Sequence, residues 1–475
     1  MTEKYLVSFV QQFPSFRLPE LDALALLFDI QLSYDKEMIP IIESDDPDIE
    51  SPFMYITVNS EEDIHKLSSR AILIRSIYKI FSEGDSYDQL LSNLNNSIQQ
   101  DKLLATYLDG KTFRIDVEAY GKKYNQKEKI TKMHLLKESS FWDHGDVSMK
   151  PKEGIEHCEL SIIEDFGVER PDRDGARKLY FGRRLISGNR DAIFKFNLQD
   201  RRYLGTTSMD PELSLISANM GLVKSGHLVL DPFVGTGSFI LVSAFCGAQV
   251  LGCDIDIKAM RKTEECNLET NFDDYGLKDN FLGILLSDNS IPAWRVAPIF
   301  DSIICDPPYG IRAGARKIGF KENRKWVNTP EGFSRDHIPQ CIDYKVPEVM
   351  ADLLELAAKT LVIGGRLVYW LPTTHEFKLT DLPKHPCLKL INANSFQALS
   401  KRWGRRLVTM EKSINFDPIL HDKSKLTEDD LGQIEPQHSD LRSVVYWRKG
   451  EKEEPKHSHQ KNKESSTTDS NNKNI

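Results

Sequence analysis

Residues 302–311, SIICDPPYGI, join a short apolar run to an acid, two prolines and a tyrosine. The apolar run predicts a buried strand, and Pro307 would end it, because proline cannot donate a hydrogen bond to a sheet ladder. Backbone carbonyls at that strand end are left without partners, and Asp306 adds a carboxylate. These acceptors favour an amino group, and Tyr309 offers a flat face on which a planar ring can stack. A stiff strand-end turn without a chemical role is the alternative.

Such a turn suits methylation of a planar amine. The lone pair of that nitrogen is delocalised into its ring, which makes it a poor nucleophile. Strong acceptors for both amine hydrogens pull the nitrogen toward tetrahedral geometry and free the lone pair for attack. The product cation then sheds a proton, to Asp306 or to water, and alignment with a sulfonium methyl supplies most of the remaining rate.

Strand-like and helical runs alternate around this turn, from about residue 204 to residue 449. Strand-like stretches such as HLVLDPF, AQVLGCDI, FLGILLSD and GGRLVYWLP alternate with helical ones such as SFILVSAFC and VPEVMADLLELAAKTLV. The pattern predicts an α/β fold with a doubly wound, mostly parallel sheet and helices on both faces. The carboxyl ends of its strands form the rim at which such folds bind ligands.

The first strand of this sheet enters a glycine turn, LDPFVGTGSFI. Gly235 and Gly237 allow close approach of a ligand to the backbone. Ile240 stands where a dinucleotide fingerprint needs glycine or alanine, and no lysine follows to make a phosphate-binding loop. The turn predicts a cofactor without a pyrophosphate, with a plain strand–helix turn as the alternative.

Acids end the next two strands. Asp254 follows the second strand near the spacing at which a carboxylate reaches ribose hydroxyls, and Asp256 is the alternative, or a helix cap. Asp288 follows the third strand, placed to accept from an adenine amino group, unless it is only a turn residue. Together they predict a nucleoside site at one rim.

A basic stretch with interleaved aromatics, IRAGARKIGFKENRKW, follows the acid–proline turn. It would suit the phosphates around a flipped base, and a solvated charged loop is the alternative. Its basic residues are Arg312, Arg316, Lys317, Lys321, Arg324 and Lys325. Two further basic sets lie at 183–202 and 401–406, so the net charge of −9 need not oppose RNA binding if they share a face.

The motifs DPFVGTG, GCDID, LSD and DPPYG, in this order, resemble the class I S-adenosylmethionine-dependent amino-methyltransferases. Residues 195–220 and the upstream LYFGRRLISGNRDAIFKF resemble the junction between a THUMP RNA-binding domain and a methyltransferase. The resemblance is to the eukaryotic catalytic subunits that methylate N2 of guanosine at position 10 of tRNA, and it extends to about residue 445.

That resemblance implies roles for particular residues. Catalysis would fall to Asp306, Pro307, Pro308 and Tyr309. S-adenosylmethionine would be bound by Asp231, Pro232, Phe233, Gly235, Thr236, Gly237, Asp254, Ile255, Asp288 and Ser208. It also implies a small zinc-binding activator subunit on the outer strand, residues 281–286; a helix of the same chain is the alternative cover for that apolar edge.

The rest of the chain predicts four parts. Residues 1–55 form an acidic α+β region, 56–200 a THUMP-like RNA-binding domain, 201–449 the methyltransferase domain, and 450–475 a disordered polar tail. The seven cysteines are scattered without a metal-binding pair, and the N-terminus has no signal sequence, so we expect a cytoplasmic protein without a metal site. A membrane span at 232–253 is disfavoured by its glycines and polar residues.

Other functions remain open. Methyltransferases of DNA adenine or of protein glutamine amides use similar turns, and an RNA-binding protein could retain an inactive methyltransferase fold. The RNA-binding region opposes the first two, and the intact acids oppose the third.

Overall fold

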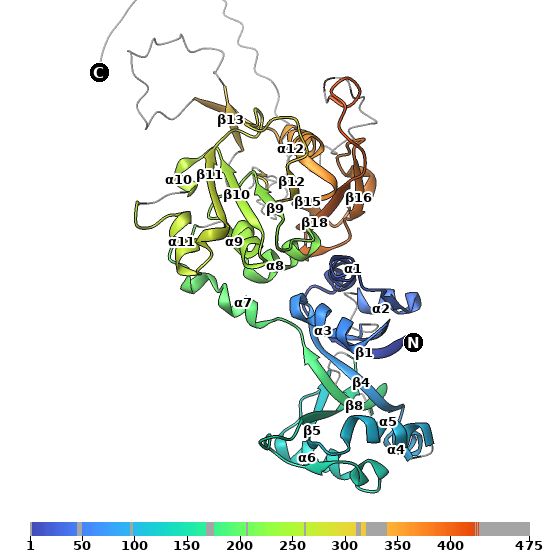
Figure 1. Cartoon of the computed structure of the whole chain (residues 1–475). Helices are drawn as coiled ribbons and strands as arrows, with labels where there is room; N and C mark the ends of the chain where they lie inside the picture. Colours follow the sequence, from blue (N-terminus) through green and yellow to red (C-terminus); the bar gives the residue numbers. More distant parts are fainter. Residues whose placement is uncertain are drawn as a thin grey trace, which may run out of the picture.

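The computed structural model describes residues 2–44, 50–95, 98–167, 175–205, 208–260, 263–309, 315–319, 340–422, 424 and 426. The methyltransferase body lies at one end and the N-terminal domain at the other, joined by the segment that contains α7 (Asp191–Lys195) (Figure 1). No helix of the described residues is long and apolar enough to cross a membrane.

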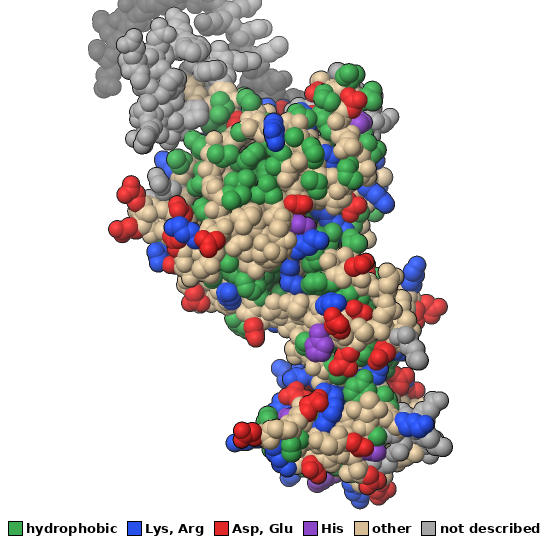
Figure 2. Space-filling view, in the orientation of Figure 1, with side chains coloured by type: hydrophobic (Ala, Val, Ile, Leu, Met, Phe, Trp, Pro, Cys, Tyr) green, Lys and Arg blue, Asp and Glu red, His purple; other side chains and the backbone are tan. Residues whose placement is uncertain are grey.

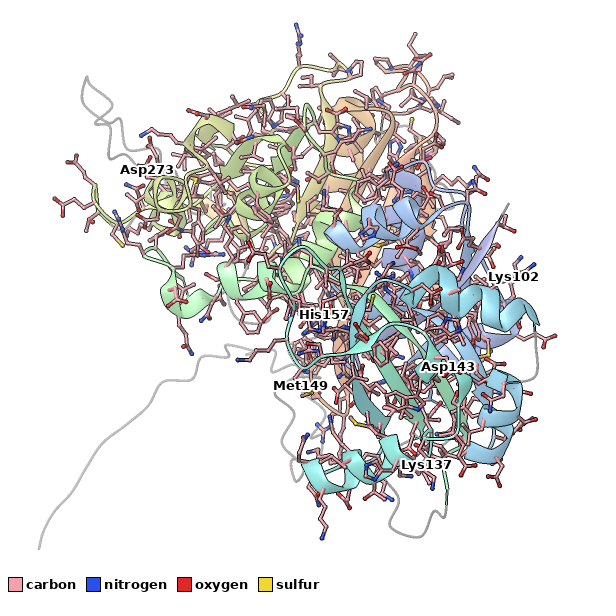
Figure 3. All side chains as sticks on the ribbon, turned by 60° about the horizontal axis from the view of Figure 1, so that its bottom comes forward. Lys102, Lys137, Asp143, Met149, His157 and Asp273 are labelled. Carbon is pink, nitrogen blue, oxygen red and sulfur yellow. The ribbon has the colours of Figure 1, made fainter. Side chains whose placement is uncertain are left out.

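The N-terminal domain is built on an eight-stranded sheet with the order β2-β3-β1-β4-β8-β7-β5-β6. Its strands are β1 (Glu3–Phe9), β2 (Ser33–Tyr34), β3 (Phe53–Val58), β4 (Ile74–Gly84), β5 (Thr112–Tyr120), β6 (Asp146–Val147), β7 (His157–Asp165) and β8 (Lys178–Ser187). Its helices are α1 (Arg17–Leu27), α2 (Ile39–Ile42), α3 (Glu61–Arg70), α4 (Tyr87–Asn95), α5 (Ile98–Leu108) and α6 (Gln126–His134). Lys102 on α5 and Lys137 after α6 lie at the outer edge of this domain (Figure 3).

Three hydrophobic clusters lie on this sheet, and two of them include helices. One packs α1 and α3 against β1 and β3, and the other packs α4 and α5 against β5, β7 and β8. The long strands β4 and β8 join the two halves (Figure 1). Because β3 spans residue 55 and pairs with β1, the sheet crosses the limit expected there; the division into domains stays a prediction.

The methyltransferase body contains a second sheet with the order β11-β10-β9-β12-β15-β18-β16. The first five of these strands are parallel, whereas β18 is antiparallel to β15 and β16 is antiparallel to β18. The strands are β9 (Leu228–Asp231), β10 (Gln249–Asp254), β11 (Phe281–Leu286), β12 (Phe300–Cys305), β15 (Leu361–Thr374), β16 (Leu388–Asn392), β17 (Phe396–Ala398) and β18 (Trp403–Lys412). This confirms the expected doubly wound, mostly parallel α/β sheet.

Helices pack on this sheet. They are α8 (Pro211–Met220), α9 (Ser238–Phe245), α10 (Ile257–Met260), α11 (Leu268–Asp274) and α12 (Val346–Thr360). A separate two-stranded sheet joins β13 (Arg316–Ile318) to β14 (Cys341–Asp343). Residues 232–253, weighed above as a membrane span, form the glycine turn, α9 and β10.

The two domains share hydrogen bonds through buried side chains. Glu20 of α1, 1% exposed, accepts from the backbone of Ile72 and Leu73 and from Asn219 of α8, at 3.1, 2.8 and 2.8 Å. Arg70 of α3 also donates to Asn219. Side chains of α1 and α8 belong to one hydrophobic cluster, so the N-terminal domain rests directly on the methyltransferase body.

Candidate functional site

The glycine turn closes the end of β9. Asp231 is 1% exposed and its Oδ1 accepts from the backbone N–H of Phe233 at 3.0 Å. Gly237 is the residue before α9 and has a φ of 81°, and a Cβ there would lie 3.0 Å from the Leu268 side chain. Only glycine meets both demands without strain, so this residue lets the turn pack closely against α11.

Asp254 ties the end of β10 to that turn. Its Oδ2 accepts from Gly235 N–H and its Oδ1 from Asp256 N–H, each at 2.9 Å. Asp256 in turn accepts from the backbone of Lys258 in α10, which is the capping alternative expected for it. Pro232 is buried, and Phe233 and Ile255 are half-buried beside these acids.

Thr236 and Ser208 meet across the turn, with their hydroxyl oxygens 2.7 Å apart. Ser208 also accepts from the Gly205 backbone N–H at 3.2 Å. The structure therefore places the segment before α8 against the glycine turn. Arg201, expected among the basic residues that would bind RNA, is buried and donates to Ser238 of α9 instead.

Asp288 lies two residues after the end of β11 and is 4% exposed. Its Oδ1 accepts from Ser290 N–H at 2.8 Å and its Oδ2 from Ile318 N–H at 2.5 Å. The backbone of β13, which follows the acid–proline turn, therefore returns to this strand end. Asn289, 7% exposed, has no hydrogen-bond partner for either amide atom among the described residues. Asn289 was not predicted as a site residue, although its position next to Asp288 in the sequence indicated that it could be one.

The acid–proline turn lies at the same rim, one strand from the glycine turn. Asp306 follows β12, which pairs with β9 on one side and β15 on the other. Its side chain is 28% exposed, Pro307 is buried, and Pro308 and Tyr309 are half-buried. In the described part of the chain, neither Asp306 Oδ1 nor the Tyr309 hydroxyl has a hydrogen-bond partner, although both atoms are buried.

The carboxyl groups of the rim affect one another. Burial raises the pKa of Asp231 well above its usual range, and the charges of Asp254 and Asp306 raise it further. Burial also raises the pKa of Asp306, and the guanidinium of Arg405 opposes that rise. The charge at the end of β12 therefore acts on the glycine turn, which agrees with the expectation that these strand ends meet at one rim.

Arg405 of β18 reaches this rim from a distant part of the chain. Its Nη1 donates to Asp306 Oδ2 at 3.4 Å. From the sequence, Arg405 was expected only as one of the basic residues at 401–406, because no sequence pattern connects it with Asp306.

The expected RNA-binding residues are only partly described. Lys317 of β13 pairs with Glu348 at 2.5 Å and lies over the Tyr344 ring, next to the exposed Arg316. Arg312, Lys321, Arg324 and Lys325 lie outside the described residues. In the second basic set, Arg183, Arg184 and Arg202 pair with Glu156, Glu159 and Asp274, which leaves that set less suited to phosphates than expected.

Strand β11 is the outer strand of the sheet, as predicted. Leu282, Leu285 and Leu286 are 54%, 41% and 53% exposed. Figure 2 shows hydrophobic side chains gathered over the region of β10 and β11. This edge therefore presents apolar side chains, and the outer side of β11 pairs with no other strand in the described part of the chain.

Comparisons with known proteins agree with this architecture. Residues 3–190 match the Tmrp11 THUMP N-terminal domain, and residues 199–321 match the RMKL-like methyltransferase domain. A Dictyostelium discoideum protein named tRNA (guanine(10)-N(2))-methyltransferase TRMT11 is 62% identical over 453 residues, covering 94% of this chain and 89% of that protein.

More distant matches have lower identity. The Homo sapiens protein of the same name is 36% identical over 434 residues, covering 87% of this chain and 89% of that protein. A crystal structure of TrmN from Thermus thermophilus matches at a TM-score of 0.41 and 16% identity, covering 86% of this chain and 100% of that one. On the strength of the identity and coverage of the first two relatives, the chain belongs to the TRMT11 family of tRNA (guanine(10)-N(2))-methyltransferases.

Proposed function

We propose that this protein transfers a methyl group from S-adenosylmethionine to the N2 amino group of guanosine 10 in tRNA. This proposal is supported mainly by the end of β12, where Asp306 Oδ1 and the Tyr309 hydroxyl are buried and have no hydrogen-bond partner within the described part of the chain. The charge of Asp306 also acts on Asp231 in the glycine turn. The high identity to a relative named for this reaction supports the choice of substrate.

The residues at the rim fit S-adenosylmethionine. The positive-φ glycines open the backbone of the turn, and the carboxylate of Asp306 beside it, paired with Arg405, would favour a cationic sulfonium over a phosphate. Asp288 keeps lone pairs beyond its two backbone donors, and Asn289 has an unpartnered amide for an adenine edge. The proposed cofactor-binding residues are Asp231, Pro232, Phe233, Gly235, Thr236, Gly237, Asp254, Ile255, Asp288 and Ser208.

The proposed catalytic residues are Asp306, Pro307, Pro308 and Tyr309. Asp306 Oδ1 and a backbone carbonyl of the turn would accept the two hydrogens of the guanine amino group, and the Tyr309 ring would stack on the base. S-adenosylmethionine, when bound, would supply the methyl group, with the electron pair of the broken S–C bond staying on sulfur. The methylated nitrogen, briefly cationic, would then lose its proton to Asp306 or to water.

We propose that tRNA contacts the N-terminal domain and the basic stretch that follows Tyr309. Reversal of Lys321, Arg324 and Lys325 to Glu should weaken tRNA binding and leave cofactor binding intact. Each lost phosphate contact should also lower the salt dependence of affinity. Unchanged tRNA affinity at moderate salt would contradict this surface.

We further propose that a small zinc-binding activator subunit pairs with the edge strand β11. An apolar edge strand tends to associate with other chains through its open side, and β11 has three exposed leucines. We also propose a reducing, cytoplasmic location, because the seven cysteines are scattered along the sequence without a paired spacing.

Mass spectrometry of nucleosides tests the function. Purified protein, with and without the activator subunit, is incubated with unmodified tRNA and S-adenosylmethionine, and DNA and protein substrates are run in parallel. We expect N2-methylguanosine at position 10 of tRNA, lost in Asp306→Ala. Asp254→Ala should lose cofactor binding, whereas Asp256→Ala, two residues away, removes only a cap of α10 and should retain it. Methylation of DNA or protein but not tRNA would refute the proposal.

A further inference from the structure

Arg405 is the charged residue of β18 that reaches the end of β12. Its Nη1 donates to Asp306 Oδ2, whereas Oδ1 has no hydrogen-bond partner among the residues that the structure describes. The two residues are 99 positions apart in the chain. The contact therefore divides the carboxylate into one oxygen held by the protein and one that remains available.

The guanidinium of Arg405 is itself held in place. Its Nε and Nη2 both donate to Gln397 Oε1, at 3.1 and 2.7 Å. Gln397 lies on β17 directly opposite Arg405 in the ladder. The guanidinium also lies 4.9 Å from the centre of the Trp370 ring, which is fully buried.

A charge fixed in this way affects how Asp306 can act. Long cationic side chains lose considerable rotamer freedom when they form a contact, but Gln397 and Trp370 have already restricted Arg405. Its orientation toward Asp306 is therefore preorganised, which is how catalytic groups are kept in register. Arg406, the next residue of β18, is held by different groups: it donates to the Ala393 carbonyl and stacks on Phe377 and Phe396.

We propose that Arg405 is a positioning residue that keeps Asp306 ionised and turns its free oxygen toward the guanine amino group. This inference rests on the proposed function, because it assigns a role in the same reaction. Arg405 itself would not touch the reacting atoms; it would act through Asp306.

The other groups that act on Asp306 set the direction of the effect. Asp231 at the end of β9 is an acid, and Cys305 and Tyr309 lie on the segment of Asp306 itself. Burial raises the pKa of Asp306, whereas the charge of Arg405 and then the neighbouring Tyr309 hydroxyl lower it. Without Arg405, Asp306 would be protonated at a higher pH and would lose its accepting charge.

The test is the pH dependence of single-turnover methylation of tRNA at saturating S-adenosylmethionine. For Arg405→Gln we expect the acidic midpoint to move upward by about one to three pH units, since that is the usual effect of an arginine on a neighbouring acid. Below the midpoint, the rate should fall about tenfold for each pH unit of that movement. Arg405→Lys keeps the charge but not the fork, so its midpoint should stay near that of the wild type while its rate is reduced.

Two further variants keep the result interpretable. Lys389→Gln removes an exposed charge from β16 and should leave the midpoint in place. Gln397→Ala keeps Arg405 but frees it, and should move the midpoint in the same direction by less. Thermal unfolding checks that each variant is folded.

The outcomes separate the two proposals. If the wild-type protein does not methylate tRNA, the proposed function fails. If the wild type is active and the pH profile of Arg405→Gln superimposes on it, or if Arg405→Gln is faster throughout, the role of Arg405 is refuted while the function stands.

Discussion

Replacing Asp306 by asparagine tests the amine-binding turn with the smallest change in shape. In the wild type, Oδ2 faces Arg405 and Oδ1 has no partner. Arginine has only donors, so the amide oxygen of the substituted side chain would turn toward Arg405. The amide NH2 would then face the guanine amino group, and two donors would oppose each other.

The size of the effect follows from that geometry. A hydrogen bond to a charged group contributes about 1.5–3 kcal/mol, and each ~1.4 kcal/mol of lost transition-state stabilisation lowers the rate about tenfold. The opposed donors add to the loss. We therefore expect Asp306→Asn to lower the single-turnover rate by about 100- to 1,000-fold, the range found when one transition-state contact is removed.

Two measurements check this reasoning. Transfer of a tritiated methyl group to tRNA gives the rate, and calorimetry gives the affinity for S-adenosylmethionine, which should be unchanged. A rate within a few-fold of the wild type would refute the role of the Asp306 charge. A loss of cofactor affinity in proportion to the rate would instead place Asp306 in the cofactor site.

Three further predictions follow from other parts of the molecule. Gly237→Ala should weaken cofactor binding measured by calorimetry, because the added Cβ meets Leu268 at 3.0 Å. Gly226 has a similar positive φ, but a Cβ there meets nothing, so Gly226→Ala should lose only stability, by about 1–2 kcal/mol. Equal cofactor affinities of the two variants would contradict this explanation. Glu20→Ala leaves the backbone N–H groups of Ile72 and Leu73 without their acceptor, removes one of the two acceptors of Asn219 Nδ2, and should lower the free energy of unfolding by about 3–5 kcal/mol. Burial raises the pKa of Glu20 to about 7, so the stability that this shift contributes is fully present below the unfolded pKa and is lost as the pH rises toward 7. Glu20→Ala should therefore also flatten that part of the pH profile of the free energy of unfolding, measured by chemical denaturation. An unchanged slope would show that Glu20 does not titrate there. Leu285→Asp on β11 should abolish co-purification of the activator subunit, while Leu399→Asp, exposed to a similar extent on the turn between β17 and β18, should not; retention by both variants would move the partner elsewhere.

Much of the fold followed from local pattern. The alternation of strand-like and helical runs predicted the parallel sheet, and the stretches HLVLDPF, SFILVSAFC and VPEVMADLLELAAKTLV contain β9, α9 and α12. Local pattern described single elements well, since their periodicity depends only on neighbouring residues.

The candidate site was predicted in part. The glycine turn, Asp254, Asp288 and the acid–proline turn were expected at one rim, because parallel strands place their carboxyl ends together. Their roles in binding and catalysis remain predictions. Asn289 was missed although it adjoins Asp288, because an asparagine after a strand is also an ordinary turn residue.

The sequence by itself determined which chemical groups stand at the strand ends, since a strand, its closing proline and its glycine turn are encoded within a few residues. Only the tertiary structure decided what meets those groups: Arg405 at Asp306, the Ile318 backbone at Asp288, and glutamates or aspartates at the arginines of the second basic set. These contacts depend on the order of strands and on the path of the chain between them. A residue's own neighbours in sequence contain no record of a partner that folding brings from 99 positions away.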